Sequence, residues 1–137
     1  MNPLTVEWVA KAEGDLTSAL RDWRARKAPN YDAACFHAQQ CTEKYLKALL
    51  QENNIAFGKT HDLVALYRLL QPIDSSWATM HNDLDRLTAY AVDFRYPGAY
   101  ATKHKASSTS SSVSPSGVLA RLTHGLDVSG ALPDELP

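Results

Sequence analysis

Hydrophobic residues recur every three or four positions over most of the first hundred residues, which is the period of an amphipathic α-helix. This pattern predicts one long helix over about residues 3–25 and a second over about residues 29–52. A short third helix is expected over DLVALYRLL, with Thr60 as its N-cap and Pro72 beyond its end. The connection before this third helix carries two apolar residues that we expect to anchor it on the core, Ile55 and Phe57.

A fourth helix is expected from about residues 74–76 to the RYPG turn, with Leu84 and Leu87 among its inward positions. No alternating pattern typical of strands is present, so the sequence predicts an all-α protein. A fifth helix starts at AYATKHKA, but the chain then enters the serine run SSTSSSVSPSG. Such a run cannot bury a core. We therefore expect a helical domain over residues 1–106 and a disordered Ser-rich tail over residues 107–137.

The second predicted helix has an apolar stripe and an unusually ordered polar stripe. The apolar stripe consists of Ala34, Ala38, Cys41, Tyr45 and Ala48, widened by Phe36, Leu46, Leu49 and Leu50. The polar stripe consists of His37, Gln40, Lys44, Lys47 and Gln51, with Gln39 and Glu43 beside it. The simplest interpretation is a solvated helix face with an i, i+4 pair between Glu43 and Lys47.

Composition narrows the class of protein only a little. The 137 residues fit one domain, and the formal net charge of −1 gives no general attraction to nucleic acids or membranes. No apolar run reaches the ~20 residues of a membrane helix and the N-terminus does not resemble a signal peptide, so a cytoplasmic protein without membrane contact is expected. Cys35 and Cys41 lie roughly 9 Å apart along one helix and cannot form a disulfide with each other. We expect no metal site and no cofactor.

Three motifs in order, ACFHAQQCTEKYLKALL, FGKTHDLVAL and YAVDFRYPG, resemble the HEPN family of small helical domains. The resemblance covers roughly residues 4–105. It implies an up-and-down bundle of four or five helices that forms a homodimer and is often encoded beside a minimal nucleotidyltransferase in toxin–antitoxin or defence modules. It also gives the polar stripe a second interpretation, in which the stripe faces a polar groove near the dimer axis.

Many HEPN proteins are metal-independent ribonucleases that use an arginine followed four to six residues later by a histidine. In such a pair, arginine stabilises charge on the attacked phosphate and histidine transfers the proton. Arg95 matches the expected position, but eight residues separate it from His104. The resemblance also implies a full last helix, which the serine run replaces, either as a natural extension or through a truncation or frameshift.

Two functions therefore remain open at this point. The first is a non-catalytic dimer that binds nucleotide or RNA phosphate and pairs with a nucleotidyltransferase. Its candidate binding residues are Arg95, Lys44, Lys47, Gln40, His37 and His61. The second is an RNA endonuclease in which Arg95 and His104 are catalytic. For His61 there is also a structural interpretation, in which it orients its loop onto the third helix by hydrogen bonding.

Overall fold

Two 22-residue helices, α1 (Pro3–Arg24) and α2 (Tyr31–Glu52), form the frame of the protein. An asparagine side chain caps each of them: Asn2 accepts a hydrogen bond from the Thr5 backbone N–H at 2.9 Å, and Asn30 accepts one from the Ala33 backbone N–H at 3.0 Å. Pro3 fits the first turn of α1, where no backbone donor is needed. Both predicted long helices are confirmed.

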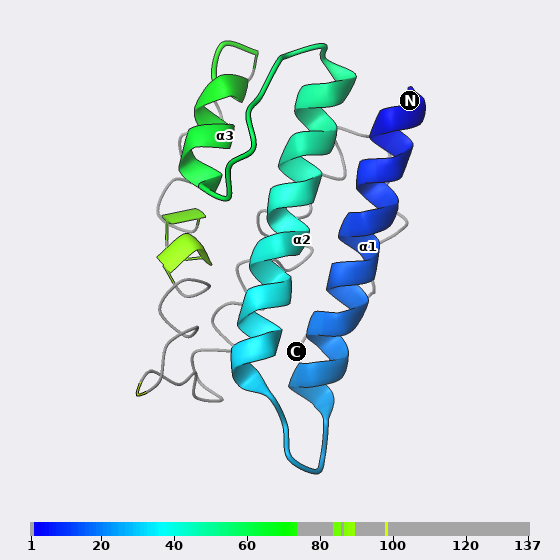
Figure 1. Cartoon of the computed structure of the whole chain (residues 1–137), viewed down its shortest axis with the longest axis vertical. Coiled ribbons are helices and arrows are strands. Elements are labelled where there is room, and N and C mark those ends of the chain that lie inside the picture. Colours follow the sequence, from blue (N-terminus) through cyan, green and yellow to red (C-terminus); the bar gives the residue numbers. More distant parts are fainter. Residues whose placement is uncertain (1, 74–83, 86, 90–97, 99–137) are drawn as a thin grey trace.

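The computed structural model describes residues 2–73, 84–85, 87–89 and 98. Figure 1 shows α1 and α2 side by side and antiparallel, with α3 (Leu63–Leu70) on the opposite side of α2 from α1. The described residues contain helices and no strand, so the all-α fold is confirmed. None of the described helices combines the length and the apolar character that a membrane span requires. The predicted tail, most of the fourth helix and the fifth helix lie outside the described residues.

The core lies where α1 and α2 meet. The predicted apolar stripe of α2 is buried, apart from Phe36, which is half-buried. Small residues line much of this contact, which lets the two helices approach closely. The residues of α1 and α2 buried in this part of the core are Val9, Ala12, Leu16, Ala19, Ala38, Cys41, Tyr45 and Ala48.

The connection between α2 and α3 turns back along α2. The Ile55 N–H donates to the Leu50 carbonyl at 2.9 Å, and Ile55 and Phe57 pack against the core as expected. The N-cap of α3 is Asp62 and not the predicted Thr60, because the Asp62 carboxylate accepts from two backbone N–H groups at the start of α3. The Thr60 hydroxyl accepts from the Asp62 N–H instead, at 3.1 Å. The prediction was therefore wrong by two residues.

Helical residues beyond α3 complete the described core. Leu84 and Leu87 are fully buried, as the sequence predicts for the fourth helix. The Leu63 N–H donates to the Thr88 hydroxyl at 3.4 Å, which joins this segment to the start of α3. The start of α3 is therefore held both by its own N-cap and by this later segment.

The two cysteines are free thiols inside the protein. Burial raises the pKa of the Cys41 thiol well above its usual range. A thiolate is the reactive form of cysteine, so Cys41 is chemically inert in the folded state. Its role is packing between α1 and α2.

The start of α1 is fastened to the end of α2. The Asn2 backbone N–H donates to the Glu52 carboxylate at 3.1 Å, and the Asn2 side-chain amide donates to the Gln51 carbonyl at 3.3 Å. The Thr5 hydroxyl, followed by the Asn2 N–H, lowers the pKa of the Glu52 carboxyl. These contacts favour the charged carboxylate in the folded protein.

Replacing Tyr45 by Phe should stabilise the protein. Tyr45 is fully buried, and its hydroxyl has no hydrogen-bond partner within the described part of the chain. Removing an unsatisfied buried hydroxyl should raise the free energy of unfolding by about 1 kcal/mol. The matched control is Tyr67→Phe, because the equally buried Tyr67 hydroxyl accepts from the Gln71 amide at 3.1 Å. Tyr67→Phe should lower the free energy of unfolding by about 1 kcal/mol. Urea unfolding measures both variants, and equal changes for Tyr45→Phe and Tyr67→Phe would contradict this interpretation.

The Glu52 contacts predict a specific dependence of stability on pH. A carboxyl with a lowered pKa in the folded state stabilises the protein above its unfolded pKa of about 4.3, and this contribution disappears as the pH falls through the folded pKa. Glu52→Gln lacks the contribution at every pH. The urea midpoint of the wild type should exceed that of Glu52→Gln at neutral pH and converge with it on acidification below about pH 4. If the difference between the two urea midpoints does not change with pH, this role for Glu52 is excluded.

Candidate functional site

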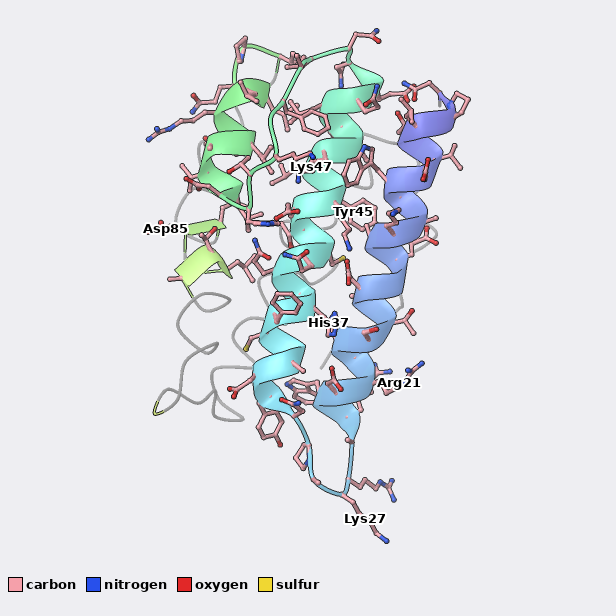
Figure 2. All side chains as sticks on the ribbon, viewed as in Figure 1. Arg21, Lys27, His37, Tyr45, Lys47 and Asp85 are labelled. Atoms are coloured by element: carbon pink, nitrogen blue, oxygen red, sulfur yellow. The ribbon has the colours of Figure 1, made fainter. Side chains whose placement is uncertain are left out.

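The polar stripe of α2 forms a partly buried seam and not a fully solvated face. One part of it meets α1, and another part lies under the connection that returns along α2 from residue 53 to residue 62. Figure 2 shows His37 between α1 and α2, and Lys47 further along α2 near the returning connection. The interpretation of this stripe as a solvated helix face is therefore wrong, because the connection after α2 runs back along the helix and covers part of it.

A carboxylate of α1 holds the first half of the seam. One oxygen of Asp15 lies 3.3 Å from His37 Nδ1, and the other pairs with the ammonium of Lys44. Asp15 is mostly buried and Lys44 is partly exposed. The positive charge of Lys44 is thus matched by a carboxylate of the neighbouring helix.

A second carboxylate, Glu43, repeats this arrangement deeper in the protein. One Glu43 oxygen lies 3.1 Å from Lys47 Nζ and the other 2.7 Å from His61 Nδ1. The side chains of Glu43 and Lys47 are only 3% and 8% exposed. Lys47 Nζ also lies 5.5 Å from the centre of the Trp8 ring, a cation–π distance. The expected Glu43–Lys47 pair is present, but it is buried by the connection and by Trp8.

Two amide side chains fix the backbone next to this cluster. The Gln39 amide donates to the His61 carbonyl at 3.0 Å, and the Gln40 amide donates to Gln39 Oε1 at 2.8 Å. Gln39 therefore holds the main chain of His61, while Glu43 holds its ring. These two hydrogen bonds fasten the connection to α2, whereas the structural interpretation of His61 expected contacts to the third helix.

The two histidines of the seam share one chemical arrangement and differ in accessibility. Each presents Nδ1 to a carboxylate, but the side chain of His61 is 74% exposed and that of His37 is 30% exposed. In the part of the chain that the structure describes, no hydrogen bond occupies His61 Nε2. Imidazoles held in this way expose one defined nitrogen for binding or proton transfer.

The predicted binding residues therefore fall into two groups. The structure brings together His37, Gln40, Lys44, Lys47 and His61 along the seam, and each of them has a partner within the protein. Only His61 is mostly exposed among them. Arg95 and His104 lie outside the described residues.

Two residues of the seam were missed as partners of the stripe, namely Asp15 and Trp8. The spacing of Asp15 contains a signal, because it lies three residues after the buried Ala12 and four before the buried Ala19. Such positions share one helix face. A charged residue on the core-facing side indicates a buried partner.

The described residues contain no group of three or more histidine, cysteine or acidic side chains placed to hold a metal ion. His37 and Cys41, one turn apart on α2, do not form such a group. Cys41 is fully buried in the core, and the Nδ1 atom of His37 faces Asp15. The seam is built from hydrogen bonds and ion pairs.

Removing Glu43 alone should be more harmful than removing it together with Lys47. Glu43→Leu leaves the buried Lys47 ammonium without a counter-charge, which should cost about 3 to 5 kcal/mol of unfolding free energy. The double variant Glu43→Leu/Lys47→Met replaces both charges by apolar groups of similar volume and should recover a large part of this loss. Urea unfolding of the three proteins provides the comparison. A double variant less stable than Glu43→Leu would show that the Lys47 charge is not held by Glu43.

A comparison with protein-family models relates this geometry to known proteins. The model described as the HEPN domain matches residues 5–114, which include α2, α3, the connection that carries His61 and all of α1 except its first two residues. Neither the comparison with curated proteins nor that with solved structures returns a match. The family model spans most of the chain, and the all-α fold agrees with it. The chain therefore belongs to the HEPN domain family.

Proposed function

We propose that this protein is a cytoplasmic, dimeric HEPN module that binds nucleotide or RNA phosphate, and that it acts with a minimal nucleotidyltransferase in a toxin–antitoxin or defence-type system. The observation that carries the proposal is the HEPN match over residues 5–114. HEPN domains are generally associated with nucleotides or RNA. The proposal needs no catalytic residue in the chain, in keeping with the long interval between Arg95 and His104.

The proposed site combines Arg95 with the seam. The guanidinium of Arg95 is permanently charged and offers planar donors that match a phosphate. Lys44 and Lys47 have carboxylate partners within 4 Å, so their charges are already largely balanced. We therefore assign the main phosphate contact to Arg95, and a supporting role to the seam and its exposed His61 ring.

The dimer in this proposal has support from the family and from the surface of α1. HEPN domains commonly dimerise, and the apolar side chain of Leu4 on α1 is more than half exposed. Leu4 lines a pocket together with Glu7, Trp8 and Lys11, which lie on the same face of α1. We assign this face to the dimer contact.

The test of the proposed function is Arg95→Ala in the full chain. Loss of one charge-assisted phosphate contact should weaken binding of a fluorescent single-stranded RNA by about 1.5 to 3 kcal/mol while leaving the thermal melt nearly unchanged. His104→Ala should change binding little. Fluorescence anisotropy measures the affinities, and light scattering on the same samples reports whether the protein is a dimer.

The control is Arg26→Ala, which removes the same charge from the exposed connection between α1 and α2. Equal losses for Arg26→Ala and Arg95→Ala would mean that only net charge matters, and the assignment of Arg95 would fail. If the wild type cleaves RNA and His104→Ala abolishes this cleavage, the endonuclease replaces the binding proposal. A protein that is monomeric at micromolar concentration would contradict the dimer.

A further inference from the structure

The buried Glu43 determines whether the second ring nitrogen of His61, Nε2, donates or accepts a hydrogen bond. Lys47 Nζ lies 3.1 Å from one Glu43 oxygen, and an ammonium at this distance favours the ionised carboxylate. An ionised carboxylate can only accept hydrogen bonds. The other Glu43 oxygen lies 2.7 Å from His61 Nδ1, so Nδ1 carries the proton and donates it.

This contact fixes the tautomer of the ring. A neutral imidazole has one donor nitrogen and one acceptor nitrogen, and with the proton on Nδ1 the acceptor is Nε2. On the neutral ring, the group that His61 offers to a ligand is therefore a hydrogen-bond acceptor, and the ring is largely exposed.

Contacts to α2 hold this acceptor nitrogen in place, although His61 itself lies on a connection. Gln39 binds the His61 carbonyl at 3.0 Å, and Glu43 binds the ring from the buried side. Both residues belong to α2 and are nearly inaccessible to solvent. A ligand that binds Nε2 therefore meets a pre-oriented atom and not a freely rotating side chain.

The surroundings of the ring suit a nucleic acid backbone. Lys59, two residues earlier, is exposed and adds a positive charge on the same connection. Oδ1 of the exposed Asp62 carboxylate accepts from the backbone N–H groups of Val64 and Ala65. Gly58 has open space where a side chain would project. The surface beside His61 is thus open to an approaching strand.

We propose that His61 Nε2 accepts a hydrogen bond from a ribose 2′-hydroxyl, so that the Glu43–His61 pair gives this HEPN module a preference for RNA over DNA. The proposal rests on the proposed function, in which the ligand is a nucleotide or RNA. Phosphate oxygens only accept hydrogen bonds, whereas the 2′-hydroxyl can donate one. The 2′-hydroxyl is also the group by which a protein distinguishes RNA from DNA.

The test compares three single strands of one sequence, as RNA, DNA and 2′-O-methyl RNA, by fluorescence anisotropy. The wild-type full chain should bind RNA about fivefold more tightly than either of the others, the scale of one neutral hydrogen bond. His61→Phe keeps a planar ring and removes Nε2. It should lower the ratio of RNA to DNA affinity to about one.

Two further variants separate direct contact from structural support. His37→Phe is the matched control, because His37 makes the same Nδ1 contact with a carboxylate but is far less exposed. It should leave the ratio of RNA to DNA affinity unchanged. Glu43→Gln removes the ionised acceptor that fixes the tautomer, and it should reduce the ratio of RNA to DNA affinity.

A measurement on the wild type covers the case in which a variant fails to fold. The ¹⁵N resonance of His61 Nε2 should shift on titration with AMP and remain unchanged with 2′-deoxy-AMP. Equal responses to both nucleotides would overturn the proposal. Equal affinity for RNA and DNA, or a preference that His61→Phe retains, would also overturn it and leave the proposed function intact. Absence of binding to every probe would overturn the proposed function itself.

Discussion

The buried carboxylate of Glu43 is the constraint on which the arrangement of α2, its connection and α3 depends. A carboxylate that is 3% exposed needs partners for both oxygens, because a buried charge without them is strongly destabilising. Lys47 supplies one partner from the same helix, and His61 supplies the other from the connection. To satisfy Glu43, the connection must run back along α2, and this path sets the point from which α3 starts.

Asp15 performs the corresponding task between α1 and α2. It joins the two helices through His37 and Lys44, just as Glu43 joins α2 to the connection through Lys47 and His61. The order of the polar stripe along α2 is explained by these two sets of contacts. Apolar packing provides most of the burial, and the carboxylates specify which polar side chain lies opposite which.

Local features of the sequence were sufficient to predict the long helices and their core. The spacing of Ala34, Ala38, Cys41, Tyr45 and Ala48 fixes one face of α2, and that face is buried. The surroundings of the polar face could not be predicted in the same way, because they depend on the path of a connection that begins near residue 53. The choice between Thr60 and Asp62 as N-cap failed for a related reason, since both can cap and only the backbone geometry decides. Arg95 and His104 remain predictions, as they lie outside the described residues.

The burial of Cys41 has a consequence for how motions of this protein can be observed. Its thiol lies between α1 and α2 and is inert in the closed state. An alkylating reagent can react with Cys41 only after the helices separate. The rate at which Cys41 is labelled therefore reports how often the α1–α2 contact opens. The native Cys41 thiol can therefore report local unfolding, and no cysteine has to be introduced for the measurement.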